Sequence, residues 1–160
     1  MAKEIERKFL VANDGWLNGI LRSQRLRDGL ILMNEGRKVR IRIQDDQAIL
    51  TVKGPREGIV RDEFEYPIPL ADGLEMIDRL CGAEVLEKTR HHVPEGELTW
   101  TVDVYGGLLS GITIAEVELP QVDHDLRLPA WVGREVTGLQ EYRKVNMVAA
   151  RRAHPSALVA

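Results

Sequence analysis

Charged residues stand at every second position through most of the short segments of this chain that resemble β-strands. If the first of these segments, EIERKF, is extended, it places Glu4, Glu6 and Lys8 on one face and Ile5 and Phe9 on the other. A helix would not keep these sets apart, because its side chains repeat every 3.6 residues. The alternation therefore restricts the chain to strands that have one charged face and one apolar face.

The charges are also sorted by sign within each segment. The rows that follow the first segment are Arg40 and Arg42, then Lys53, Glu63 and Glu65, Lys88 and Arg90, Asp103, and Glu116 and Glu118. Like charges two residues apart lie ~7 Å from each other and repel by roughly 2 kcal/mol at an effective dielectric constant near 20. For one strand a solvated outer face is the ordinary interpretation, but a surface built for solubility would mix its signs. We therefore expect the rows to line the inside of a barrel, with the apolar face outward under helices.

The segment lengths predict a mainly β fold of the α+β class. Strands are expected at residues 3–11, 24–33, 37–44, 47–53, 59–68, 84–93, 97–105 and 112–119. Helices are expected at residues 13–21, 70–80 and 141–151. Eight short strands joined by tight turns predict an eight-stranded antiparallel β-barrel with a few flanking helices. The 160 residues suit one domain, expected at 1–154, followed by a frayed tail at 155–160.

The composition narrows the class of protein. The net charge of −3 argues against a nucleic-acid partner, which usually selects a strongly basic protein. Cys81 is the only cysteine, so neither an internal disulfide nor a cysteine zinc site can form. The N-terminus lacks an apolar signal core and no apolar run approaches the length of a membrane span. We therefore expect a soluble cytoplasmic protein with no membrane partner.

The mixture of charges on the inward face indicates a particular ligand chemistry. Arginine and lysine side chains complement a row of phosphates, arginine through paired hydrogen bonds and lysine as a point charge. Clustered carboxylates bind hard cations such as Mg²⁺ or Mn²⁺, which also bridge phosphate oxygens. Each half would repel itself if it stood alone. Together the two halves predict a site for a metal–polyphosphate complex.

An ordered series of motifs resembles the CYTH superfamily, the triphosphate tunnel metalloenzymes, and in particular its short bacterial inorganic triphosphatases. The series begins with EIERK at residues 4–8, the ExExK signature, and covers almost the whole chain. It continues through VRIRI, LTVKG, RDEFEYPI, EKTRHHV, VDVYGG and AEVELP, and ends in REVTGLQEYRK. The resemblance implies an eight-stranded antiparallel tunnel that binds a triphosphate together with a divalent metal.

The resemblance also implies a role for each matching residue. The phosphate-binding residues are expected to be Lys8, Arg40, Arg42, Lys53, Lys88, Arg90, Arg134 and Lys144, with Arg143 as the alternative to Lys144. The metal ligands are expected to be Glu4, Glu6, Asp103, Glu116 and Glu118. Catalysis is expected to involve Lys8, Glu63, Glu65 and Asp103, the acids by placing a second metal or the attacking water.

The function implied is metal-dependent hydrolysis of a linear triphosphate, inorganic tripolyphosphate first, with Mg²⁺ or Mn²⁺ as cofactor. A class IV adenylate cyclase, a thiamine or nucleoside triphosphatase, and a non-catalytic module that binds polyphosphate or nucleotide remain alternatives. The partner is expected to be a triphosphate-containing small molecule, and a homodimer stays open. One position departs from the pattern: many triphosphatases resemble QGYL where this chain has DGLI, so Leu30 stands where a tunnel tyrosine is expected.

Overall fold

The computed structural model describes residues 3–82 and 85–158 of the 160-residue chain. The strands are β1 Lys3–Val11, β2 Arg22–Asn34, β3 Arg37–Gln44, β4 Gln47–Lys53, β5 Val60–Ile68, β6 Val85–Glu95, β7 Leu98–Tyr105, β8 Thr113–Glu118 and β9 Val132–Glu135. The α-helices are α1 Leu70–Leu80 and α2 Lys144–Ala153. Short 3₁₀ helices span Asp14–Gly19 (η1), Gly107–Leu109 (η2) and Gln140–Tyr142 (η3).

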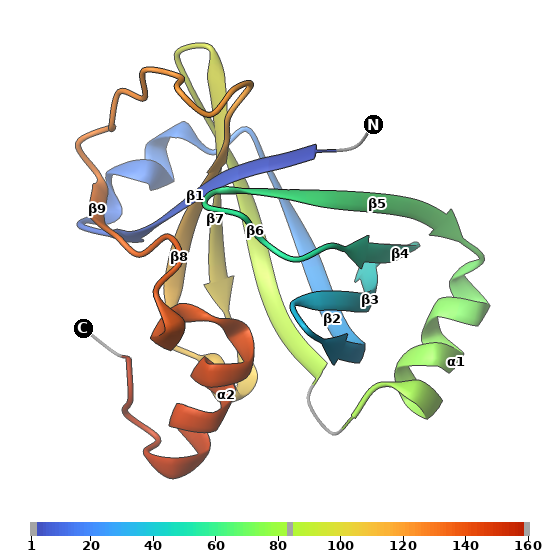
Figure 1. Ribbon diagram of the computed structural model, residues 1–160. Helices are drawn as coiled ribbons and strands as arrows, with labels where there is room; N and C mark the ends of the chain where they lie inside the picture. The colour runs from blue at the N-terminus through green and yellow to red at the C-terminus, as the bar shows by residue number, and fades with distance from the viewer. Residues whose placement is uncertain (1–2, 83–84, 159–160) are drawn as a thin grey trace.

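Eight of these strands close into an antiparallel barrel, as the sequence predicts (Figure 1). The order around the barrel is β5-β4-β3-β2-β6-β7-β8-β1, and β1 pairs with β5 to complete the circle. Strand β1 closes the barrel with its first residues and pairs with β8 over Glu6–Leu10. The far end of β1 also pairs with β9, which lies outside the circle of eight.

The apolar faces of the strands point outward and are covered in three places. A cluster around Phe9, Trp100 and Trp131 packs over the strands near β1 and β7. Helix α1 packs against β3 and β4, where the absence of a side chain at Gly73 lets the helix approach Ala48 closely. Helix α2 packs on a cluster that includes Leu109. Val52, Phe64 and Tyr66 on β4 and β5 lie outside these three covered places and stay exposed. The charged rows alternate with the apolar residues and therefore face the interior.

Several boundaries differ from the sequence-based expectation. The segment expected to be a helix at 13–21 forms the shorter 3₁₀ helix η1. The terminal helix begins at Lys144 instead of 141, because Arg143 is extended and separates η3 from α2. Strand β9 was not predicted, since four residues are too few to show alternation. Position 84, the expected start of a strand, lies outside the described residues.

The described residues of the C-terminal segment, where a frayed tail is expected at 155–160, contact the rest of the chain. The Arg151 guanidinium donates to the backbone carbonyls of Pro155, Ala157 and Ser110. Leu158 packs against the apolar cluster under α2. Residues 159–160 lie outside the described residues. None of the helices in residues 3–82 and 85–158 has the length and hydropathy needed to cross a membrane.

Candidate functional site

A cavity of about 1530 Å³ occupies the interior of the barrel. Its wall includes the predicted residues Glu4, Glu6, Lys8, Leu30, Arg40, Arg42, Lys53, Glu63, Glu65, Arg90, Glu116, Glu118, Arg143 and Lys144. The period-2 pattern therefore places these charged rows on the inner face. Helix α2 and η3 contribute to the wall as well, so the terminal segment closes one part of the cavity.

The strand register explains how rows of like charge are tolerated. Directly opposed pairs of opposite sign are Glu4 with Arg61, Lys8 with Glu116, Arg42 with Asp28, Lys53 with Glu63, and Arg90 with Asp103. Each row repels itself along its own strand but faces countercharges on the neighbouring strand. Cross-strand pairs of opposite charge stabilise a sheet and like pairs destabilise it. The sorting of signs by strand is thus a property of the closed barrel.

Two opposed pairs within the described strands carry the same sign. Glu6 on β1 faces Glu118 on β8, and Lys38 on β3 faces Lys53 on β4. Burial and the nearby carboxylates of Glu4 and Glu6 raise the pKa of Glu118. Burial, together with nearby cations including Lys53, lowers the pKa of Lys38 to about 8. The barrel therefore has one acidic position suited to a cation and one basic position suited to an anion.

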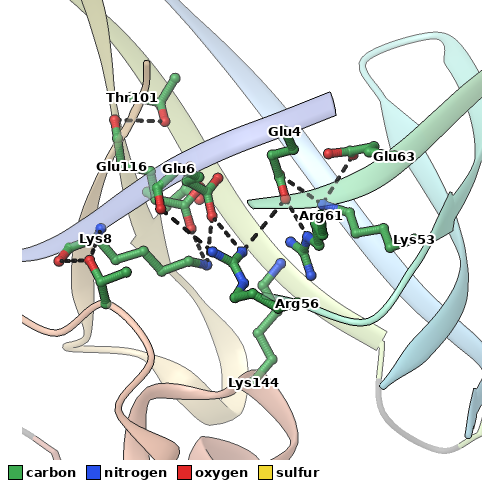
Figure 2. Close-up of polar contacts among 12 residues, drawn as sticks. Glu4, Glu6, Lys8, Lys53, Arg56, Arg61, Glu63, Thr101, Glu116 and Lys144 are labelled. Carbon is green, nitrogen blue, oxygen red and sulfur yellow. Dashed lines mark hydrogen bonds and ion pairs between the residues drawn. The ribbon is translucent and has the colours of Figure 1, made fainter. Parts of the chain in front are cut away.

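The lysine of the ExExK motif is held by two acids (Figure 2). The Lys8 ammonium donates to Glu116 Oε1 at 2.8 Å and lies 3.3 Å from Glu6 Oε1. Although burial opposes the charge, Glu116 and Glu6 raise the pKa of Lys8. Lys8 is therefore a permanent cation in the cavity wall.

Glu4 and Glu63 form the acidic part of the wall near the start of β1. Lys53 Nζ lies 3.0 Å from a carboxylate oxygen of each acid, and Arg61 also donates to Glu4 (Figure 2). Burial and a hydrogen bond shared with Glu4 raise the pKa of Glu63 to about 7. Arg56 Nη2 lies 3.6 Å from both Glu4 and Glu6 and so bridges the two acids of the motif.

Asp103 and Lys88 lie behind the cavity wall and are not among its lining residues. The Asp103 carboxylate is fully buried, accepts two hydrogen bonds from Arg90 at 2.7 and 2.8 Å, and also pairs with Lys88. Burial opposes ionisation, but Lys88 and Arg90 lower the pKa of Asp103 to about 2. Arg90 in turn reaches Glu116 Oε2 at 3.0 Å. Asp103, a predicted metal ligand, therefore already forms ion pairs with the side chains of Lys88 and Arg90.

Arg134 also lies away from the cavity lining. It is exposed, donates to the Tyr142 hydroxyl at 3.2 Å and stacks over the Tyr142 ring. Tyr142 itself lines the cavity, so Arg134 contacts the wall from behind. Both alternatives on the terminal segment, Arg143 and Lys144, line the cavity.

Sequence reasoning missed eight charged residues of the wall, namely Lys3, Arg22, Asp28, Glu35, Lys38, Arg56, Arg61 and Arg152. A usable signal existed for two of them, because Lys38 precedes Arg40 by two residues and Arg61 precedes Glu63 by two. Arg56 lies in the loop after β4, where the alternation of strand residues does not predict the direction of a side chain. Asp28 lies between Leu26 and Leu30 in its same-face row and so belongs to no charged row.

The carboxylates of the wall suit a hard divalent cation. Within the described ranges, no three His, Cys, Asp or Glu side chains are already grouped around one point. Mg²⁺, however, is typically held by one or two carboxylates together with substrate phosphates. Glu6 and Glu118 oppose each other. Glu6 Oε1 is buried and accepts no hydrogen bond from the described residues, although Lys8 Nζ and Arg56 Nη2 lie 3.3 and 3.6 Å from it. These acids fit a cation that binds together with a polyphosphate.

Comparison with known proteins agrees with this geometry. The CYTH domain family matches residues 2–149. An inorganic triphosphatase of Acetivibrio thermocellus is 40% identical over 148 residues, which cover 92% of this chain and 94% of the relative. A solved inorganic triphosphatase structure is 30% identical with a TM-score of 0.65, covering 91% of this chain and 97% of the other.

A more distant structure shares the fold. A putative adenylyl cyclase from Hippeastrum, described as having a dominant triphosphatase activity, is 15% identical with a TM-score of 0.55. The match covers 76% of this chain and 80% of that one. At this identity the likeness concerns the barrel alone.

Proposed function

The chain belongs to the CYTH domain family, and on that premise we propose that it is a metal-dependent phosphohydrolase that cleaves inorganic tripolyphosphate inside its barrel. The observation that carries the proposal is the cavity, whose wall sets fixed cations against carboxylates and leaves one like-charge pair of each sign. An extended anion accompanied by a divalent cation neutralises both pairs at once. A purely cationic ligand would relieve only the acidic pair, and a neutral ligand would relieve neither pair.

The basic residues of the wall are proposed to hold the phosphates along the tunnel. Lys8, Arg40, Arg42, Lys53 and Arg90 line the cavity and stay within reach of their acidic partners, which keeps them oriented before substrate binds. Preorganised cations stabilise charge on a transferring phosphoryl group without reorganising during the reaction. Lys88 and Asp103 support this row from behind by fixing Arg90.

The acidic residues are proposed to bind the metal and to place the attacking water. Glu4, Glu6, Glu116 and Glu118 would hold Mg²⁺ or Mn²⁺, which when bound offsets phosphate charge and lowers the pKa of bound water. Glu63 and Glu65, on the same face of β5, orient the water toward the terminal phosphorus. The water oxygen forms a bond to the terminal phosphorus while the bond between that phosphorus and the bridging oxygen breaks. The products are orthophosphate and pyrophosphate.

A turnover assay tests the proposal. Purified protein is incubated with tripolyphosphate, pyrophosphate, ATP or thiamine triphosphate, each with Mg²⁺, with Mn²⁺ or with EDTA, and released orthophosphate is measured. We expect the largest kcat/KM for tripolyphosphate, and we expect no release of orthophosphate in EDTA. Tight binding of tripolyphosphate with no release of phosphate under any condition would instead support the non-catalytic binding module.

Formation of cyclic AMP from ATP is measured in the same assay. A dominant cyclase activity would contradict the hydrolase proposal, because the attacking group would then be the ribose hydroxyl. An activity on thiamine triphosphate above that on tripolyphosphate would keep the reaction class and change the substrate.

A further inference from the structure

Asp28 is an acid that lies among the cations of the phosphate-binding wall. It is 5% exposed, on the inward face of β2 between two leucines. Its carboxylate accepts hydrogen bonds from Arg42 Nε at 2.7 Å and Arg42 Nη2 at 2.9 Å. Arg40 Nη1 lies 3.6 Å from Oδ2, and Lys144 Nζ donates to Oδ2 from 3.3 Å. One carboxylate thus gathers three cations from two different elements.

The paired contact with Asp28 decides how Arg42 meets a ligand. The bond from Nε and Nη2 uses one edge of the guanidinium and fixes the plane of the group. The remaining donors are thereby held in one direction within the cavity. Arg40 is fixed in a similar way, between Asp28 on one side and the Thr51 hydroxyl at 3.3 Å on the other.

The contact with Lys144 attaches the terminal helix to the barrel. Lys144 is the first residue of α2, and its ammonium enters a region that also contains Lys88, Arg40 and Arg42. Burial, together with Lys88, Arg40 and Arg42, lowers the pKa of Lys144 well below its usual value. Asp28 is the carboxylate that Lys144 contacts and that opposes this shift. The position of the N-terminal end of α2 over the cavity therefore depends on Asp28.

We propose that Asp28 is a positioning residue, which orients Arg40 and Arg42 for phosphate binding and holds the first turn of α2 against the barrel through Lys144. The proposal rests on the proposed function, since it assigns a task within the same cavity. It also explains why an acid occupies a wall that must bind an anion. Asp28 weakens the attraction for phosphate and in exchange keeps three cations in defined positions.

The first test is kinetic. In Asp28→Asn the cavity loses one negative charge near the phosphates, so we expect KM for tripolyphosphate to fall about ten-fold, since unit charges a few ångströms apart interact strongly in a partly buried site. We expect kcat to fall by a similar factor, because the arginines lose their orientation and pyrophosphate leaves more slowly. Asp28→Glu, which keeps the charge, should recover part of kcat. Lost orientation lowers kcat whichever way the charge change moves KM, so an unchanged kcat in folded Asp28→Asn would overturn the proposal.

The second test does not depend on turnover. Amide hydrogen exchange is measured by mass spectrometry over α2 in Asp28→Asn, in Lys144→Gln and in the double variant. We expect faster exchange in α2 in each single variant and no further increase in the double variant, because both remove the same contact. Unchanged exchange in α2 in a folded Asp28→Asn protein contradicts the attachment.

Glu87→Gln serves as the matched control, because Glu87 is exposed on β6 and pairs with Arg27, which precedes Asp28 on β2. It removes one negative charge but should leave KM, kcat and exchange in α2 unchanged. If the wild-type protein failed to hydrolyse tripolyphosphate, the proposed function would fall. The dissociation constant for tripolyphosphate, measured by calorimetric titration, would then be compared in place of KM. Tighter binding and faster exchange in α2 of Asp28→Asn would still test the role of Asp28.

Discussion

Lys8 on β1 and Glu116 on β8 are directly opposed in the strand register, and the lysine ammonium lies 2.8 Å from the glutamate oxygen. The two residues stand 108 positions apart in the chain. Before any ligand binds, the lysine of the signature motif is thus oriented by an acid of the proposed metal set. Binding of a metal by Glu116 would leave Lys8 free to contact phosphate, so the two halves of the site are coupled through this pair.

Replacement of Lys8 by methionine is predicted to lower kcat/KM for tripolyphosphate by about 10–100-fold, since a hydrogen bond to a charged group contributes roughly 1.5–3 kcal/mol. Steady-state kinetics measure the loss, and circular dichroism checks that the variant is folded. Arg79→Gln is the control, because Arg79 forms an exposed pair with Glu75 on α1. Equal activity of Lys8→Met and wild type would remove Lys8 from the site.

Removal of metal is predicted to abolish turnover. EDTA should reduce the rate to background and excess Mg²⁺ or Mn²⁺ should restore it. Glu6 and Glu118 face each other, and Lys8 and Arg56 compensate only Glu6, so a bound cation removes the remaining repulsion. Glu118→Gln should weaken the response to metal and leave the melting temperature equal or slightly higher, since one member of a repelling pair is lost. Full turnover in metal-free buffer would exclude the mechanism.

The affinity for tripolyphosphate is predicted to fall as the pH rises through about 8, where Lys38 loses its proton. Burial lowers the pKa of Lys38, and the nearby cations Arg61 and Lys8 lower it further. Once Lys38 is neutral, its amine no longer attracts phosphate. Lys38→Met should remove this part of the pH dependence, as measured by calorimetric titration from pH 7 to 9. A pH profile identical to that of wild type would show that another group is responsible.

The Lys38 amine also makes the stability of the folded protein depend on pH. The pKa of Lys38 in the folded protein, about 8, is below its ordinary value of 10.5. Between these pH values the unfolded chain binds more protons than the native protein, so the free energy of unfolding rises with pH. Urea unfolding should show this contribution in wild type and its loss in Lys38→Met.

Leu30 lines the cavity, so replacement by tyrosine places a hydroxyl inside the tunnel. Leu30→Tyr is predicted to raise kcat about ten-fold, because a hydrogen bond to a charged group contributes roughly 1.5 kcal/mol or more. Leu30→Phe adds the ring without the hydroxyl and should not raise the rate. A flat rate with a lower melting temperature in Leu30→Tyr would indicate overpacking and no role for the hydroxyl.

The two faces of β3 are predicted to respond oppositely to substitution. Ile41 is fully buried in the cluster under α1, so Ile41→Asp should unfold the protein through an unpaired buried charge. Arg40 faces the cavity, so Arg40→Ala should stay folded and bind tripolyphosphate more weakly. Thermal melting and calorimetric titration distinguish the two. A stable Ile41→Asp beside an unfolded Arg40→Ala would reverse the assignment of the faces.

The barrel and the inward rows could be predicted from the sequence because side-chain direction in a strand is a local property. A residue and its second neighbour share a face whatever the strand later pairs with. For this reason the alternation alone predicts that Arg40 lies with Arg42, and Glu116 with Glu118, and all four residues line the cavity. The same rule applies to Lys38 and Arg61, each of which extends a charged row by one step.

Tertiary structure alone decided which charges meet. Register between strands depends on turn geometry and closure, so the contact of Lys8 with Glu116 across 108 positions has no local signature. Asp103 alternates like a cavity residue, yet the cations of β6 enclose it completely. Asp28 has apolar neighbours in its own row, and its importance follows from contacts with β3 and α2. The sequence by itself therefore determined the sidedness of the strands, whereas closure of the barrel determined the partners, because pairing energies depend on distances that only the folded chain sets.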